Sequence, residues 1–587
     1  MKPPLPRLRP TAQTRVTTAV FPGYDRRLRG RDGTVFEAKN LTTARWPSLA
    51  SRPPRGLVTT LSAPRGLIAK DALCWIDGGT LYVNGLATAV TGLSSGEKQL
   101  VGMGAYIVIF PDKVYYNTEN AADFGSLEAS YTSAGEVQYT LCRADGTDYE
   151  NVQTGPDEPE DTTAVWISTA GGTAAAMSWS VSYGGWVELG TVYTKLEFTS
   201  QGSIPTLFRE GDGVTVSGSA FADANGEKIL YAVGGSGEAG HEENDYVVLV
   251  GLLENSFSQT GGAVTIERRA PDLDFVCEAG NRLWGCFYGV KDGQTLNEIC
   301  CCALGDFKNW RQYRGLSTDS WTASVGSDGP WTGAVNYLGS PVFFKEDRLH
   351  RVGISASGAH TLRETVCRGV QRGSHKSLAV VNETLFYKSR AGFCAWQGGF
   401  PQGVSEALGE EHYDSAAAGA AGGRYAVSMK DGSDNWHLFV YDIEKGLWMR
   451  EDGLHVLQFA PLEGELYALA ADGRLLALSG AAGTPEESVA WEAVSGVHSF
   501  ETPDRKTLSR YDLRLRLAPG AQAAAYLEYD GSGEWLPCGT LSRTGFGTAL
   551  LPIRPRRCDH LRMKLSGTGG MELLSVTRVL EKGSDVG

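Results

Sequence analysis

The sequence predicts an all-β protein: a β-propeller of about seven blades, an all-β domain inserted into it and a C-terminal β-sandwich. Glycine makes up 74 of 587 residues, and such an excess in a folded chain indicates many tight turns between short strands. Short β-type runs alternate with Asp-Gly, Gly-Gly and Asn-Gly turns, and helical periodicity is almost absent. The runs gather into about seven units of two to four strands. Because sheets this small cannot bury both faces alone, we expect them to stack radially as propeller blades.

The composition excludes several classes of protein. Hydrophobic residues make up 42% and charged residues 21%, which is typical of a folded chain. No apolar run approaches the ~20 residues of a membrane-spanning helix, and the N-terminus has no apolar signal-peptide core, so we expect no membrane span. The eleven cysteines include no C-x2-C pair, so we expect buried, reduced thiols rather than zinc ligands.

Residues 1–55 differ from the rest of the chain in charge. They carry a formal charge of +9, whereas the remaining 532 residues sum to −23. Because this segment is also proline-rich, we expect an extended basic arm that docks on an acidic neighbouring protein. A solvated tail and nucleic-acid contact are the alternatives, but the acidic body argues against direct DNA contact. The candidate partner-binding residues are Arg7, Arg9, Arg15, Arg26, Arg27 and Arg29.

Two segments, 56–126 and 266–484, carry the expected blades. Typical hairpins are Leu73–Ile76 with Thr80–Val83, and Phe275–Glu278 with Arg282–Tyr288 across Ala279-Gly280-Asn281. Residues 415–423 are small and glycine-broken, which indicates a close-packed inner strand or loop. Residues 127–265 interrupt the regular spacing of the blades and are interpreted as an all-β domain inserted into one blade. Residues 485–587 alternate like the strands of a separate sandwich.

No motif marks a catalytic, cofactor or metal site. The chain has no phosphate-binding loop and no G-x-S-x-G elbow. Ser327-Asp328-Gly329-Pro330-Trp331 resembles part of the Asp-box turn of sialidase propellers, for which we expect a structural role. His375 is expected to hold its loop by hydrogen bonds. A glycosidase needs a pair of carboxylates, and nothing singles out a pair among Asp328, Glu346, Asp347, Glu410, Glu411 and Asp414. We therefore expect a protein that is not an enzyme and has no cofactor.

Segments spread over nearly the whole chain share a pattern with a known family. They are Asn40–Gly56, Asn281–Cys286, Ala303–Trp310, Gly326–Gly333, Phe343–Asp347, Arg368–Leu378, Pro555–His560 and Gly583–Val586. On these segments the sequence resembles phage and prophage virion structural proteins from gut-type Firmicutes. More distantly it is similar to the packaged-DNA stabilisation (tail-hub) proteins of short-tailed phages. The resemblance implies a propeller-containing virion protein of the neck, tail or tail hub.

The expected function is therefore non-enzymatic. The propeller serves as a scaffold whose arm and appended β domains dock neighbouring virion proteins (neck, tail or portal-proximal), in several copies on a symmetric particle assembled in the host bacterial cytoplasm. The alternative is a carbohydrate-binding or carbohydrate-cleaving propeller that contacts the host cell envelope. A cleft that combines Trp, Arg and carboxylates favours the alternative, and an arm that reaches outside the body favours assembly.

Overall fold

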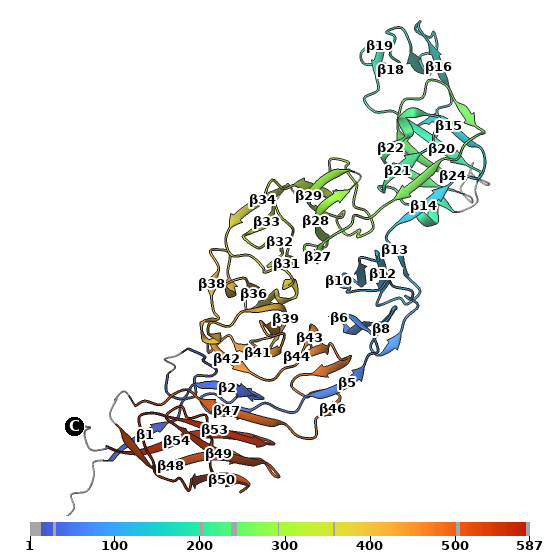
Figure 1. The fold of residues 1–587 in the computed structure, drawn as a ribbon. Coiled ribbons are helices and arrows are strands. Elements are labelled where there is room, and N and C mark those ends of the chain that lie inside the picture. The colour runs from blue at the N-terminus through green and yellow to red at the C-terminus, as the bar shows by residue number, and fades with distance from the viewer. Residues whose placement is uncertain are drawn as a thin grey trace, which may run out of the picture.

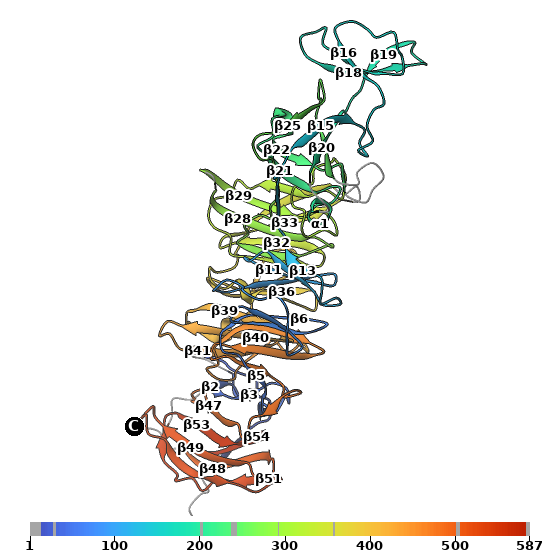
Figure 2. The ribbon, with the colours of Figure 1, turned by 90° about the vertical axis from the view of Figure 1, so that its right-hand side faces the viewer.

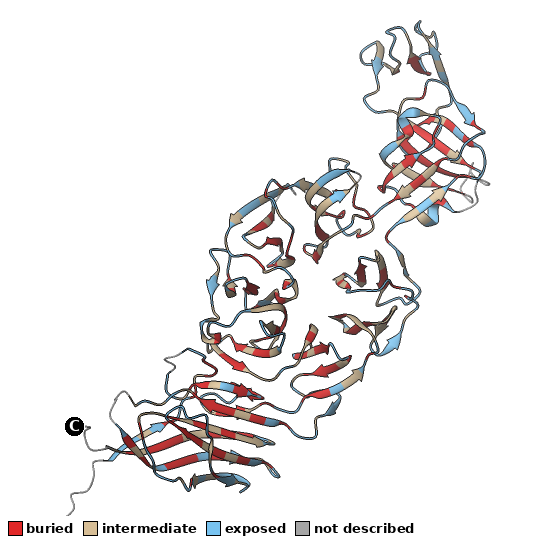
Figure 3. Cartoon of the chain, viewed as in Figure 1, coloured by how far each residue is buried: buried red, intermediate tan, exposed pale blue. Residues whose placement is uncertain are grey.

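The computed structural model describes residues 13–27, 31–199, 203–235, 244–291, 293–355, 359–500 and 505–582. Within these ranges the helices are α1 (Ile204–Leu207) and three 3-10 turns, η1 (Ala222–Ala224), η2 (His375–Ser377) and η3 (Glu406–Leu408). All other regular structure is β, so the predicted all-β class is confirmed. A sandwich, a ring of sheets and an inserted domain follow one another along the molecule (Figures 1 and 2). Buried residues concentrate in the strands of each (Figure 3).

In the described part of the chain, seven sheets of four or five strands form the ring, and we number them blades 1 to 7. Blades 1 to 3 consist of β6 (Pro64–Lys70), β7 (Ala72–Asp77), β8 (Thr80–Val83) and β9 (Leu86–Ala87); β10 (Gln99–Met103), β11 (Tyr106–Phe110), β12 (Val114–Asn117) and β13 (Phe124–Ser126); and β27 (Phe275–Glu278), β28 (Leu283–Lys291), β29 (Gln294–Cys301) and β30 (Trp321–Ser324). Blades 4 to 6 consist of β31 (Gly333–Tyr337), β32 (Ser340–Lys345), β33 (Arg348–Ile354) and β34 (His360–Val366); β35 (Ala379–Val381), β36 (Thr384–Ser389), β37 (Gly392–Trp396) and β38 (Gln402–Gly403); and β39 (Tyr413–Ala421), β40 (Arg424–Asp431), β41 (Trp436–Asp442) and β42 (Leu447–Arg450). Blade 7 consists of β43 (Val456–Leu462), β44 (Glu465–Ala470), β45 (Arg474–Ala477), β5 (Gly56–Thr60) and β46 (Thr484–Pro485).

One tight turn recurs where the first two strands of a blade meet. In blade 3, Gly280 and Asn281 have φ of 62° and 58°, which is the two-residue geometry that matches the twist of a hairpin. The same pair of positive φ values occurs at the corresponding turns of blades 4 to 7, at 338–339, 382–383, 422–423 and 463–464. The predicted inner strand at 415–423 is part of β39, where a Cβ at Gly419 would lie 2.4 Å from Phe459 Cβ of the next blade. This glycine therefore permits the two inner strands to pack closely.

The hydrophobic core lies between blades rather than within them. Ile76 and Leu81 of blade 1 pack with Ile107 and Ile109 of blade 2, and separate clusters join blades 2 and 3, 3 and 4, 4 and 5, and 6 and 7. Blades 5 and 6 meet in a cluster that they share with the sandwich. Trp284 and Phe343, for example, lie in the cluster between blades 3 and 4. Each blade therefore depends on its neighbours for burial, as radial stacking requires.

The ring closes through β5, which precedes blade 1 in the chain but lies in blade 7. Its residues pair antiparallel with β45, from Gly56 against Ala477 to Thr60 against Arg474. Apolar side chains seal the same joint, because Leu67 and Trp75 of blade 1 pack with Leu469 and Leu475 of blade 7. The N-terminal and C-terminal parts of the chain thus complete one sheet together.

Both ends of the chain also build the sandwich. One sheet contains β3 (Leu41–Thr42), β4 (Leu49–Ser51), β54 (Met571–Lys582), β48 (Lys506–Leu517) and β51 (Gly545–Leu550), with β1 (Gln13–Thr18) and β52 (Arg557–Cys558) paired to it. The other contains β2 (Val35–Lys39), β47 (Ala490–Ser495), β53 (Leu561–Thr568), β49 (Gln522–Tyr529) and β50 (Leu536–Leu541). Its core is continuous with that of blades 5 and 6, since Tyr24 and Tyr511 share one cluster with Phe439 and Trp448.

The expectation of an extended arm over residues 1–55 is wrong from Gln13 onward among the described residues. β1 pairs with β54 over six residues, and β2 pairs with β47. The segment between them lies against blade 6, where Tyr24 N donates to Trp448 O at 2.7 Å. The positive charge suggested an exposed arm, but two of its arginines are buried in ion pairs. Residues 1–12 and 28–30 lie outside the described residues.

Those two arginines join the ring to the sandwich. Arg55, whose side chain is 2% exposed, contacts Glu451 and Asp452 at 2.7 Å each. Arg52, whose side chain is 4% exposed, contacts Glu486 at 2.7 Å. Glu451 and Asp452 come from the end of blade 6, and Glu486 comes from the chain between β46 and β47. The cluster therefore fixes the residues just before β5 to blade 6 and to the connection between the ring and the sandwich.

The inserted domain contains three sheets. The first has β14 (Ala129–Thr132), β26 (Thr265–Arg268), β21 (Gly213–Ser217) and β22 (Gly226–Ile229), and the second has β23 (Ala232–Gly234), β24 (Asp245–Val250), β20 (Tyr193–Phe198), β15 (Val137–Cys142) and β25 (Phe257–Gln259). The third, which we call the tip sheet, has β16 (Val152–Gly155), β17 (Val165–Ser168), β18 (Ala175–Ser180) and β19 (Gly185–Glu188). The insert connects β13 of blade 2 to β27 of blade 3, so it lies between two blades rather than within one.

A buried amide fastens the insert to blade 3. Asn309, 1% exposed, donates from Nδ2 to Gly211 O at 2.8 Å and accepts from Gly213 N at 3.1 Å. Arg268, at the end of β26, pairs with Asp212 at 2.5 Å and donates to Leu127 O. The insert is therefore docked by side chains as well as tethered by its two connections.

Closing the ring requires glycine at position 56. A Cβ there would lie 1.8 Å from the carbonyl oxygen of Ala482. We expect Gly56→Ala to lower the free energy of unfolding by about 1–3 kcal/mol, because the closing strand must shift. Gly432→Ala is the matched control, since its Cβ would meet open space and its φ is not left-handed. Calorimetry of the full chain measures both, and equal transition temperatures for the two variants contradict this prediction.

The buried ion pairs of Arg55 give a second prediction. Arg55→Leu leaves Glu451 and Asp452 with only Arg52, at 3.9 and 3.8 Å. We expect a loss of about 3 kcal/mol in the free energy of unfolding, because the carboxylates lose their closest cation. Arg474→Leu removes a pair in which both side chains are exposed (43% and 53%), and we expect a loss below about 1 kcal/mol. Denaturant unfolding compares the two, and similar losses contradict the assignment.

Candidate functional site

Of the six predicted arginines, the three within the described residues do not lie in one place. Arg15 is exposed on β1 in the sandwich. Arg26 donates its backbone N–H to Ala407 O at 2.9 Å, and its guanidinium lies 4.5 Å from the Phe36 ring. Arg27 pairs with Asp25 at 2.7 Å. Arg26 and Arg27 therefore lie together against the chain that leads into blade 6, away from Arg15. Arg7, Arg9 and Arg29 lie outside the described residues, and partner binding by the six arginines stays a prediction.

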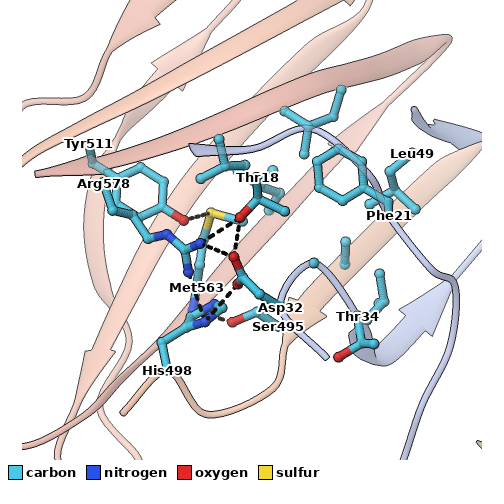
Figure 4. A pocket seen from close by; sticks show the side chains of 16 residues that line it. Thr18, Phe21, Asp32, Thr34, Leu49, Ser495, His498, Tyr511, Met563 and Arg578 are labelled. Carbon is cyan, nitrogen blue, oxygen red and sulfur yellow. Dashed lines mark hydrogen bonds and ion pairs between the residues drawn. The ribbon is translucent and has the colours of Figure 1, made fainter. Parts of the chain in front are cut away.

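A polar cluster anchors the N-terminal segment between the sandwich sheets (Figure 4); Arg578 is buried in it, whereas the Asp32 side chain is 45% exposed. Arg578, 2% exposed, donates from one nitrogen to Asp32 at 2.5 Å and to Thr18 at 2.6 Å. Its other terminal nitrogen lies 2.8 Å from Nδ1 of His498. Thr18 also donates to Asp32. Two residues from the N-terminal segment thus meet two from the C-terminal part across the core.

The electrostatics of this cluster favour a neutral histidine and an ionised aspartate. Burial and the neighbouring charge of Arg578 lower the pKa of His498 to about 4. Burial tends to raise the pKa of Asp32, but hydrogen bonds from Arg578 and Thr18 outweigh it and lower that pKa. A neutral His498 accepts a hydrogen bond from Arg578, so the cluster is an anchor rather than an acid–base pair. Nε of Arg578 is buried without a hydrogen-bond partner among the described residues.

The ring has a polar cavity of about 430 Å³ between blades 5 and 6. It is lined by Lys388, Arg390, Ala391, Gly392, Phe393, Ser405 and residues 408–413. Arg390, Glu410 and Glu411 bring both signs of charge to it, and no tryptophan is among its lining residues. The cavity thus has two of the three side-chain types expected of a sugar cleft.

One strongly perturbed group at this cavity is Lys388, which is 3% exposed. Its Nζ donates to Gln371 Oε1 at 2.7 Å and to Ser389 O at 2.6 Å. Burial lowers its pKa to about 8, although the charge of Asp414 opposes that change. Sequence reasoning missed this lysine. The signal was present, because Phe343-Phe344-Lys345 and Phe386-Tyr387-Lys388 place a lysine at the end of the second strand of successive blades.

The carboxylates considered for sugar cleavage are dispersed. Asp347 pairs with Arg348 at 2.8 Å, and Glu346 accepts from Arg372 N at 3.1 Å. Asp328 accepts from the Tyr288 hydroxyl at 2.8 Å. Glu410, Glu411 and Asp414 lie near the cavity, where Oδ1 of Asp414 is buried without a hydrogen-bond partner among the described residues.

The turn that resembles an Asp-box is a packing element. Trp331, 4% exposed, donates from Nε1 to Phe287 O at 3.2 Å, and Asp328 caps its own turn through Gly329 N. Nearby, Ser327 Oγ and Glu364 both contact Nε2 of His350, at 3.0 and 3.1 Å. A nucleophile–base relay uses both ring nitrogens, so this cluster does not have triad geometry.

His375 links distant parts of the ring. Its Nε2 lies 3.1 Å from Oε1 of Glu97, which precedes blade 2, whereas His375 precedes blade 5. Lys376 contacts the same carboxylate at 3.1 Å and donates to Leu457 O in blade 7. Burial opposes ionisation of Glu97, but these bonds outweigh it and lower its pKa to about 2. The hydrogen-bonding role expected of His375 agrees with this geometry.

The described ranges contain no cluster of three or more His, Cys, Asp or Glu residues that could hold a metal ion. The same ranges contain no helix long and apolar enough to span a membrane. The eleven cysteines are free thiols.

Comparison with known proteins gives weak similarities. No protein-family profile and no curated protein matches the sequence. Among solved structures, an exo-β-1,3-galactanase of Phanerochaete chrysosporium is 8% identical with a TM-score of 0.20, covering 52% of this chain and 94% of its own. The extracellular domain of a B. thetaiotaomicron hybrid two-component system is 10% identical (TM-score 0.22; 91% and 81% covered). A Trypanosoma rangeli sialidase is 9% identical (TM-score 0.21; 91% and 96% covered). Similarity at this level says nothing about what this chain binds.

The anchor at Arg578 predicts a pH dependence of stability. Between about pH 6.5 and 4 the unfolded chain binds a proton at His498 that the folded chain does not, so the free energy of unfolding falls as the pH falls. Asp32 adds to the loss only below its unfolded pKa of about 3.9. We expect His498→Asn to reduce the slope by up to about 1.4 kcal/mol per pH unit in that window.

Hydrogen exchange of β54 peptides, corrected for the intrinsic pH dependence of exchange, measures this slope. The variant and the native chain are compared at pH 7.5 as well, where the protonation contribution is absent. An unchanged slope between pH 6 and 4.5 contradicts the buried neutral state of His498.

Proposed function

We propose that the protein is a non-enzymatic structural component of a bacteriophage virion, in the neck, tail or tail hub. One observation carries the proposal: three β bodies form a single elongated unit, with the sandwich at one end and the insert at the other (Figures 1 and 2). The sandwich shares its core with blades 5 and 6, and the insert is docked on blade 3 by a buried amide. A stiff body of this kind suits a scaffold that holds neighbours at a fixed separation, in several copies on a symmetric particle.

The resemblance of the sequence to phage and prophage virion proteins also supports the proposal. An arm that reaches outside the body would have been further support, but residues 13–27 and 31–55 are folded into the sandwich and ring. We therefore assign docking to the surfaces of the sandwich and the insert, and not to those residues as a free arm.

A carbohydrate-binding propeller is the second candidate. The observation that favours it is the polar cavity between blades 5 and 6, where Arg390 lies with Glu410 and Glu411. Glycan arrays and hydrolysis assays on the purified chain test this candidate. Arg390→Ala is the matching variant, since this side chain is 74% exposed and its loss leaves the core intact.

The virion proposal is tested on particles induced from the bacterium that carries the gene. We expect mass spectrometry to find the chain at fixed stoichiometry and electron cryomicroscopy to place it in the neck or tail. Intact particles that lack the chain overturn the proposal, and glycan binding abolished by Arg390→Ala then supports the second candidate.

A further inference from the structure

The two faces of the tip sheet have different surroundings. The sheet lies at the end of the molecule opposite the sandwich in both views (Figures 1 and 2). Val165, Ile167 and Ala176 point from one face into the core of the insert. Side chains alternate along a strand, so Trp166 of β17 belongs to the opposite face.

That opposite face is aromatic. Trp179 and Trp186 are directly paired across β18 and β19, with ring centroids 5.7 Å apart, and Trp166 lies 5.6 Å from Trp186. Trp166 is buried, whereas Trp179 and Trp186 are half-buried. The hairpin that joins β18 to β19 adds Val181 and Tyr183, which are 89% and 78% exposed. Val181 and Tyr183 therefore expose apolar surface beside the half-buried rings of Trp179 and Trp186, and such surface marks an interaction site.

The surroundings of this face are acidic. Between Arg143 and Lys195 the chain has eight aspartates and glutamates and no lysine, arginine or histidine. Glu188 lies at the end of β19, two residues from Trp186 and therefore on the same face. Aromatic rings and carboxylates together favour a cationic ligand, which the rings hold through cation–π contact and the carboxylates through charge-assisted hydrogen bonds.

The chain itself contains a segment of matching chemistry. Residues 1–12 include Pro3, Pro4, Pro6 and Pro10 together with Lys2, Arg7 and Arg9, and no acidic residue. Proline-rich segments bind in aromatic-lined grooves because their backbone needs little ordering.

The segment of one copy is too short to reach its own tip. β1 begins at Gln13 in the sandwich, and the ring lies between the sandwich and the insert (Figure 1). Twelve residues span at most about 43 Å. The ring alone is about 40 Å across, because two blades of four strands at ~4.8 Å spacing face each other, and the insert extends beyond it.

We propose that the aromatic face of the tip sheet binds residues 1–12 of a second copy of this chain. The contact is head-to-tail, so copies at a suitable angle close into a ring, as a symmetric particle requires. The inference rests on the proposed function, since it names the partner through which a multi-copy scaffold assembles.

The first experiment uses a fluorescent peptide of residues 1–12, titrated by anisotropy into a chain that lacks those residues. We expect binding that weakens with added salt. A peptide with Arg7→Ala and Arg9→Ala should bind at least about tenfold more weakly, as the loss of ~1.4 kcal/mol implies. A peptide with its prolines replaced by alanine should also lose affinity. No binding of the native peptide overturns the inference.

Variants of the chain locate the site. Tyr183→Ser and Glu188→Gln alter exposed side chains and leave the buried face of the tip sheet intact, and each should weaken peptide binding several-fold. Tyr313→Ser is the matched control, because Tyr313 is also exposed (50%) but lies in blade 3. Equal binding by all three variants places the peptide elsewhere and overturns the inference.

Sedimentation of the full chain supplies the assembly readout. We expect concentration-dependent association that disappears when residues 1–12 are removed, whereas association that persists contradicts the head-to-tail contact. Particle composition is measured independently of both experiments. If the chain is present in particles but does not bind the peptide, only this inference is contradicted. If the chain binds the peptide but is absent from particles, only the virion proposal is contradicted.

Discussion

The pairing of β5 with β45 is the constraint on which the rest of the structure depends. A ring of small sheets has two free edges until a strand from one end of the chain completes the blade at the other end. Here Gly56–Thr60 supplies that strand, and the cluster of Leu67 and Trp75 with Leu469 and Leu475 seals the joint. Each cluster between blades needs both neighbours in place, so the closing contact stabilises the whole ring and not only blade 7.

The closing strand also decides what the preceding residues can do. Because Gly56 is fixed in blade 7, the chain before it must lie near the outer edge of blades 6 and 7. The chain that connects β46 of blade 7 to β47 of the sandwich also leaves the ring there. The strands β1 to β4 therefore combine with C-terminal strands into one sandwich. Arg52 and Arg55 lie at this crossing, and acidic residues from blade 6 and from the chain after β46 surround them. Positive charge in this part of the chain thus serves internal cohesion.

A body organised in this way has two kinds of free surface. The ring carries mixed charges around a polar cavity, whereas the far end of the insert carries tryptophans among carboxylates. The first suits a small polar ligand, and the second suits a basic, proline-rich segment. A scaffold protein needs surfaces of the second kind at fixed distances from one another. The core shared by the sandwich and the ring and the Asn309 contacts of the insert provide that fixed geometry.

Local features of the sequence determined the all-β class, the positions of the hairpins and the existence of the insert. The turn at Gly280-Asn281 could be predicted because a two-residue hairpin needs positive φ, which those residue types favour. The tertiary structure alone decided where residues 13–27 and 31–55 lie, because a strand's sequence does not identify the strand with which it pairs. β1, for example, pairs with residues more than 550 positions away. It also decided which charges are buried, as at Arg578 and Lys388. The sequence records that a residue is charged, whereas burial and pairing depend on segments that only the folded chain brings together.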